Sequence, residues 1–132
     1  MRPMRAPRQL IERWGAAVLL MLGIFVLSSR TPAELPDFGW ADRVLKKGGH
    51  MLGYGLLALS YWHGMRRQAH HKPLAWALAV LYGATDELHQ AFVPGRHPSA
   101  VDLLLFDSTG AALALWLGRR LPAGKTPTRA PK

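Results

Sequence analysis

Apolar residues along this chain gather into four long segments that are separated by short charged stretches. The segments cover residues 14–29, 48–64, 73–93 and 100–118, and each has 16 to 21 residues. A helix needs roughly 20 apolar residues to cross a bilayer. A soluble amphipathic helix would carry charges every three or four positions along one face, and these segments do not. The pattern therefore predicts an all-α fold, a four-helix transmembrane bundle.

A soluble helical bundle is the main alternative for this pattern. The 132 residues are too few to cover four helices that are apolar all round, so we favour the membrane bundle. The first segment also has the arginine-rich start of a signal peptide, but no clean small-x-small cleavage site follows it. We therefore expect a basic tail at 1–13, one membrane domain at 14–118 and a disordered basic tail at 119–132.

The distribution of basic residues predicts the orientation of the bundle. The formal net charge is +9, and twelve of the 17 Lys and Arg lie in the two tails and in residues 65–72. By the positive-inside rule, both termini are then cytoplasmic. Aromatic residues do not alternate with the basic ones, as they would in a single-strand binder, so no nucleic-acid partner is expected. The absence of cysteine excludes disulfides and thiolate chemistry.

Acidic residues inside the apolar segments are the most informative exceptions to the pattern. Asp86, Glu87, Asp102 and Asp107 lie in the third and fourth segments, where a central charge costs about 2.5–3.5 kcal/mol on insertion scales. The predicted orientation places them near the outer surface. Other polar residues of the second and third segments recur at helical spacing, so we expect them to lie near the same outer surface. The candidate outer-face binding residues are Lys47, His50, Tyr54, Asp86, Glu87, Gln90, Arg96, Ser99, Asp102 and Asp107.

Two details limit what this cluster predicts. On an ideal α-helix Asp102 and Asp107 are about 140° apart, so they should not both face the same neighbour. The same residues could also form an ion-pair and hydrogen-bond lattice that merely fixes helix packing. No catalytic residue, metal ligand set or cofactor site is assigned from these residues.

The run YGATDELHQAFVPGRHPSAVDLLLFDSTGAALALWLG at 82–118 resembles the signature of the VanZ-like family of small bacterial membrane proteins. That signature has an acidic-Gln stretch, a Pro-Gly-Arg link, and an Asp before a Gly-rich helix. FVLSS at 25–29, Lys47 with His50, and Tyr54 with Leu57 agree with it, so the resemblance covers about residues 24–118. The chain departs from the pattern at Asp107, where Asn is usual, and in a spacing from Asp102 that is one residue longer.

The resemblance implies a multi-pass protein of the bacterial cytoplasmic (inner) membrane that acts in the cell envelope. The family is named for reduced susceptibility to teicoplanin, a lipoglycopeptide antibiotic. On this basis the outer-face cluster is expected to bind a lipid-linked or peptidoglycan-related group, with the bilayer as the other partner. Arg96 suits a phosphate or carboxylate because its planar fork donates two parallel hydrogen bonds.

Two other functions remain open from the residues. An intramembrane enzyme could use His50 with nearby carboxylates for acid–base or metal-dependent chemistry on a lipid-linked substrate. The chain contains no HExxH pair, Ser-centred elbow or Gly-rich phosphate loop, which favours a non-enzymatic role. Proton or solute transport is the third candidate, but no acid lies in the cytoplasmic half of the first two segments.

Small residues at four-residue spacing predict close helix contacts in the fourth segment. Gly110, Ala114 and Gly118 have this spacing. Small side chains let helix backbones approach closely in lipid, where the hydrophobic effect no longer drives association. The sequence thus predicts a helix–helix interface here, and self-association of the chain is one use of it.

Overall fold

Helices make up the architecture of residues 5–120, the part of the chain that this computed structural model describes, and no strand occurs among them. Helix α1 spans Arg5–Ser28, α2 spans Asp42–Gly64 and α3 spans Lys72–Gln90. The fourth helix consists of α4 at Ala100–Asp102, a π-helical segment at Leu103–Asp107 and α5 at Ser108–Leu117. Short 3-10 turns lie at 32–34, 39–41, 69–71 and 118–120.

The predicted all-α class is confirmed, and each apolar segment coincides with one helix except at its end, since α1 ends at Ser28 and α3 already ends at Gln90. Two helices start earlier than predicted. Helix α1 begins at Arg5, within the predicted basic tail, and α2 begins at Asp42, before the apolar run. Both extensions are charged, so hydropathy alone did not indicate them. The remaining parts of the predicted tails, residues 1–4 and 121–132, lie outside the described residues.

Two helices of the described chain are long and apolar enough to cross a membrane, Pro7–Ser28 and Ala100–Arg120. Helices α2 and α3 have comparable lengths of 23 and 19 residues, but they carry charges that lower their hydropathy. The charged residues are Asp42, Arg43, Lys46 and Lys47 in α2 and Lys72, Asp86 and Glu87 in α3. Four helices are thus present as predicted, while the crossing of the membrane by all four stays a prediction.

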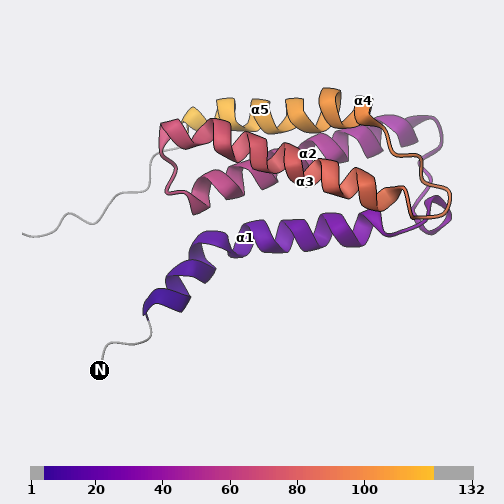
Figure 1. Cartoon of the computed structure of the whole chain (residues 1–132). Coiled ribbons are helices and arrows are strands. Elements are labelled where there is room, and N and C mark those ends of the chain that lie inside the picture. The colour runs from indigo at the N-terminus through magenta and orange to yellow at the C-terminus, as the bar shows by residue number, and fades with distance from the viewer. Residues whose placement is uncertain (1–4, 121–132) are drawn as a thin grey trace, which may run out of the picture.

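Helix α2 occupies the centre of the arrangement and packs against α1, α3 and α5 (Figure 1). The connections 29–41 and 91–99 lie together at one end of the bundle, which we call the polar end. The start of α1, the loop at 65–71 and the end of α5 lie at the opposite end, which we call the basic end. The first turns of α1 diverge from the other helices (Figure 1).

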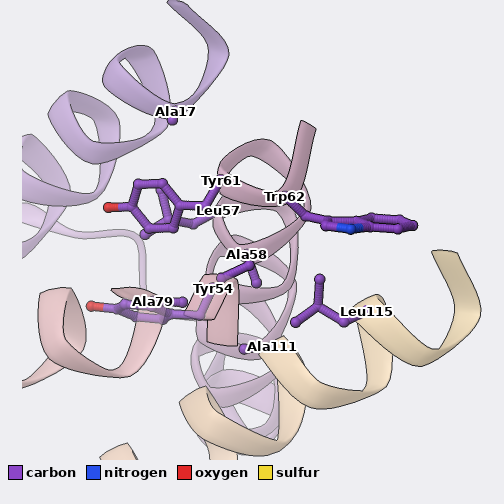
Figure 2. Packing of buried hydrophobic residues seen from close by; sticks show 10 residues of the cluster. Ala17, Tyr54, Leu57, Ala58, Tyr61, Trp62, Ala79, Ala111 and Leu115 are labelled. Carbon is purple, nitrogen blue, oxygen red and sulfur yellow. The ribbon is translucent and has the colours of Figure 1, made fainter. Parts of the chain in front are cut away.

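Small side chains dominate the apolar core, which runs along α2. Five of the buried apolar residues are alanines, and four of these, Ala58, Ala75, Ala79 and Ala111, are fully buried. Larger members come mainly from α2: in Figure 2 Tyr61 and Trp62 leave this helix on opposite sides. Most of the described leucines instead lie outside, with Leu19 71% and Leu52 65% exposed, while Leu57 and Leu115 are buried in the core. An apolar exterior over a small-residue interior is typical of helices that pack in lipid.

The close contact of α5 with α2 depends on glycine. A Cβ on Gly110 would lie 2.8 Å from the Cα of Met51 in α2, and one on Gly118 would lie 3.0 Å from the Cδ2 of Leu59. The small-residue spacing of the fourth helix therefore serves contacts within one chain. Self-association through Gly110, Ala114 and Gly118 stays a prediction.

Candidate functional site: a polar cavity at one end of the bundle

A cavity of about 280 Å³ lies at the polar end, and we call it the polar cavity. Helix α2, helix α3, the 91–99 connection and the fourth helix all contribute to its wall. Its lining combines four acidic, four basic and two histidine side chains with three other residues. The lining residues are Asp42, Arg43, Lys46, Lys47, His50, Glu87, Gln90, Gly95, Arg96, His97, Asp102, Phe106 and Asp107.

Beneath the cavity, Asp86 accepts hydrogen bonds from three helices. Its Oδ2 accepts from Ser28 Oγ of α1 at 2.7 Å, from Tyr54 Oη of α2 at 3.2 Å and from Gln90 Nε2 of α3 at 2.9 Å. The Asp86 side chain is 4% exposed, and its Oδ1 has no partner within the described chain. The carboxylate thus joins α1, α2 and α3 at one point, and three neutral donors compensate its burial.

Two lysines on consecutive positions of α2 form ion pairs at the cavity. Lys47 Nζ lies 2.9 Å from Asp102 Oδ1 and 4.4 Å from the ring centroid of Phe106. Lys46 Nζ lies 2.7 Å from Asp42 Oδ2 one helical turn away. The hydrogen bond from the Lys46 ammonium holds the pKa of the Asp42 carboxyl below its ordinary value. Both pairs are partly exposed, so each is weak and open to competition from another ion.

A histidine and a deeply buried carboxylate face each other across α2 and the fourth helix. His50 Nδ1 lies 3.6 Å from Asp107 Oδ1, which is longer than a hydrogen bond. Asp107 is 2% exposed, and its Oδ1 has no hydrogen-bond partner in residues 5–120. The pair therefore places one titratable group at the cavity wall and an unpartnered carboxylate oxygen behind it.

The π-helical segment changes the expected relation between Asp102 and Asp107. In this segment the N–H of Ser108 donates to the carbonyl of Leu103, five residues back. A wider turn rotates less per residue, so the five-residue step from Asp102 to Asp107 comes closer to one full turn. The expectation that the two acids face different neighbours was wrong, because it assumed ideal α-helical geometry. Both line the polar cavity.

The connection between α3 and the fourth helix is fixed by Glu87 and Ser99. Glu87 Oε2 accepts the backbone N–H of Ser99 at 2.7 Å. Ser99 in turn caps the fourth helix, because its Oγ accepts the N–H of Asp102 at 3.2 Å. Glu87 thereby fixes the cap at which the fourth helix begins, and so the position from which Asp102 reaches Lys47.

Arg96 contacts backbone rather than a carboxylate. Its Nε donates to the carbonyl of Arg30 and one Nη to the carbonyl of Leu27, each at 3.1 Å. These carbonyls belong to the last turn of α1 and the residues after it, where a helix leaves its final carbonyls without intrahelical partners. The carbonyl of Leu27 also accepts the N–H of Arg30 at 3.2 Å. The guanidinium therefore ties the 91–99 connection to α1 while its charge stays at the cavity wall.

The structure brings the sequence-derived candidates into one region. Seven of the ten line the polar cavity, namely Lys47, His50, Glu87, Gln90, Arg96, Asp102 and Asp107. Tyr54 and Asp86 lie beneath it, and Ser99 supports it through Glu87 and Asp102. Ser28 was missed as a site residue, although it lies in the FVLSS run and is buried against Asp86. A serine at the end of an apolar run was the available signal.

Within residues 5–120, no three His, Asp or Glu side chains are grouped as metal ligands. The arrangement offers instead cationic groups that can receive an anion, carboxylates that hold them in place, and one His–Asp pair. Such a set can bind a charged headgroup or exchange a proton.

An all-helical chain with membrane-length apolar helices and a charged cavity at one end belongs to the class of helical, membrane-associated proteins. The sequence model of the VanZ/LLP1 family matches residues 6–121. The chain belongs to this family, as its resemblance indicated. No curated protein matches the chain, and neither does any solved structure.

Proposed function

We propose that this VanZ-family chain crosses the bacterial cytoplasmic membrane four times, with both termini in the cytoplasm and the polar end outside. At 1.5 Å per residue, helices of 19 to 24 residues are about 28 to 36 Å long, which matches a hydrocarbon core of about 30 Å. Basic residues concentrate at the opposite end, as the positive-inside rule requires of a cytoplasmic face.

The polar cavity, on this proposal, binds an anionic envelope group that is lipid-linked or derived from peptidoglycan. By doing so the protein modulates susceptibility to teicoplanin. One observation carries the proposal: charged residues from α2, α3, the 91–99 connection and the fourth helix line a single cavity at the end predicted to face outward. Intramembrane ionisable residues are expensive and mark functional pathways or sites by default.

Lys47 is the residue best suited to contact such a group. Its ion pair with Asp102 is partly exposed, with side-chain exposures of 36% and 41%. A phosphate or carboxylate entering the cavity can therefore share the ammonium with Asp102 at little cost. Glu87 contributes by fixing the position of Asp102.

Cysteine labelling tests the proposed orientation. The chain has no cysteine, so a single introduced thiol reports on one position. Asp37→Cys lies in an exposed connection at the polar end, and Ala69→Cys lies in the exposed loop at the basic end. A membrane-impermeant maleimide should label Asp37→Cys in intact cells, whereas it should label Ala69→Cys only after the cells are lysed. The reverse pattern would contradict the orientation.

Drug susceptibility tests the proposed binding role with a matched pair of lysines. Lys47→Ala should return a teicoplanin-tolerant expressing strain to the susceptibility of the vector control. Lys72→Ala makes the same change at the basic end and should leave tolerance intact. Equal tolerance in both variants, at equal protein levels, would contradict a role for the polar cavity. Arg96→Ala is a poorer test, because Arg96 also holds the end of α1.

An intramembrane acid–base enzyme acting on a lipid-linked envelope substrate is the second candidate, favoured by the His50–Asp107 pair. A buried carboxylate behind a cavity-facing imidazole is the arrangement that orients a general base. His50→Gln and Asp107→Asn should then change the lipid-linked intermediates that mass spectrometry detects in expressing cells. Unchanged intermediates, with tolerance still dependent on Lys47, would favour binding alone.

A further inference from the structure

A second cavity, also about 280 Å³, adjoins the polar cavity, and we call it the apolar groove. It lies between α1, the 29–41 connection and α2, and most of its wall is aliphatic or aromatic. Its lining residues are Ile24, Leu27, Ser28, Leu35, Pro36, Phe38, Leu45, Lys46, Gly49, His50, Gly53, Tyr54 and Arg96. Three of them, Lys46, His50 and Arg96, also line the polar cavity, so the two spaces share a wall.

Two glycines of α2 create the open space of the groove. A Cβ on Gly49 would meet no atom within 4 Å, and one on Gly53 would only touch the Cγ1 of Ile24 at 4.0 Å. Neither position needs glycine for close helix packing, in contrast to Gly110. Both lie inside a helix, where glycine is less favourable than alanine. What the missing side chains provide is room beside α2.

The charges of the groove favour an anionic occupant. No acidic side chain lines it, and its three side chains that carry or can accept positive charge all lie on the shared wall with the polar cavity. Arg96 donates to backbone carbonyls and has no carboxylate within ion-pair distance in residues 5–120. A mostly apolar space whose wall includes basic side chains fits a hydrocarbon chain that carries a phosphate.

We propose that the apolar groove and the polar cavity form one site for an anionic membrane lipid. The hydrocarbon chain lies along Gly49 and Gly53, and the phosphate lies at Lys46, His50 and Arg96. This inference rests on the proposed function, because it names the ligand class of the polar cavity and the route by which its lipid part is held.

Photolabelling of the purified full chain tests the inference. The protein is reconstituted in phosphatidylcholine vesicles that contain a trace of phosphatidic acid with a diazirine in its acyl chain. Wild type should be labelled within 24–28 and 45–54, and Gly49→Leu should reduce this labelling about tenfold by filling the groove. Gly48→Leu is the matched control, because a Cβ on Gly48 would also meet no atom within 4 Å and Gly48 lines neither cavity.

A second pair of variants avoids dependence on the folding of Gly49→Leu. Leu45 is a half-exposed wall residue, and Leu45→Gln should also weaken labelling. Val44→Gln, at a more exposed position outside both cavities, should not. Equal labelling of Gly49→Leu and Gly48→Leu, or labelling spread evenly over all lipid-facing helices, would overturn the inference.

Three further arms separate this inference from the proposed function. Equal labelling by a diazirine phosphatidylcholine would overturn the anionic assignment. Competition by glycerol 3-phosphate as strong as that by phosphatidic acid would show that the site binds a free phosphate, and it would overturn the assignment to a lipid. If groove labelling is as expected but Lys47→Ala keeps teicoplanin tolerance, the lipid site stands and the proposed role in susceptibility fails.

Discussion

The polar end and the basic end of this bundle are held together by different interactions. At the polar end, Asp86 and the Lys47–Asp102 pair connect helices through directed hydrogen bonds and charges. Toward the basic end, fully buried Ala75 and Ala79 of α3 pack against α2 with no polar contact between them. Apolar close packing holds helices together without leaving room, whereas directed polar contacts can hold them around a cavity.

The difference has an energetic origin. Lipid offers no hydrophobic gain to apolar contacts, so the buried alanines of α3 gain from van der Waals contact, which requires small residues and close approach. One directed contact adds to this packing at the basic end, where Arg13 Nε donates to the carbonyl of Gly64 at 3.0 Å. Polar groups in the same environment must find partners, which fixes their geometry. We therefore expect substitutions at the two ends to fail in different ways.

Removing the Asp86 carboxylate should have the largest effect on stability. Asp86→Ala leaves the donors of Ser28, Tyr54 and Gln90 without their acceptor, and at about 1–3 kcal/mol for a buried unpaired group the total loss should approach ~3 kcal/mol. Denaturation in detergent micelles measures it. Asp86→Asn keeps an acceptor and should lose much less. A loss for Asp86→Ala no greater than for Asp86→Asn would show that the polar end does not depend on this carboxylate.

Overpacking the α2–α3 contact should be the next largest effect. Ala79 is fully buried, so Ala79→Leu should force the helices apart and cost about 1–3 kcal/mol. Ala77→Leu makes the same change on the exposed side of α3 and should be nearly neutral. The thermal midpoint in micelles compares the two. If the two variants have the same thermal midpoint, close packing is not what holds α2 and α3 together.

The Lys47–Asp102 pair should contribute little to stability despite its position at the cavity. Both side chains are partly exposed, so Lys47→Ala should cost no more than about 1 kcal/mol. Its consequence for teicoplanin tolerance should be much larger, and the ratio of the two effects identifies a binding rather than a packing role. A large drop in melting temperature would instead make the pair structural.

Loss of the cation–π contact between Lys72 and Trp62, at the basic end, should have the smallest effect on stability. The Nζ of Lys72 lies 4.5 Å from the centroid of the Trp62 ring, a cation–π contact worth about 0.5–1 kcal/mol at an exposed site. Lys72→Ala should therefore lower stability slightly, and Lys72→Arg should restore it. A change in melting as large as that of Ala79→Leu would contradict the division between directed contacts and packing.

The sequence was sufficient for the helices and for the gathering of polar residues at one end. Charges such as Asp86 and Asp107 inside apolar runs are costly unless they meet partners, so their clustering follows from orientation and helical spacing. The same argument indicated Lys47 and Asp102, which form an ion pair. The VanZ resemblance was confirmed by the family match.

Other features could not be predicted because they depend on local geometry. Arg96 was expected to offer its fork to a ligand, but two of its nitrogens donate to carbonyls near the end of α1. Gly110, which packs against Met51, and Gly49, which borders open space, look alike in the sequence, since both are glycines in apolar helices. Only the neighbouring helix distinguishes a contact from a groove.

The π-helical segment at 103–107 changes which side of the fourth helix its residues face. It accommodates one residue more than an α-turn would, so everything after Ser108 keeps its azimuth against α2 while Asp107 is turned inward. Deleting one exposed residue, such as Leu104, would let an ordinary helix form without displacing α5. The direction of the Asp107 side chain would then change while the rest of the bundle stays in place. The orientation of this buried carboxylate can therefore be altered at this turn alone.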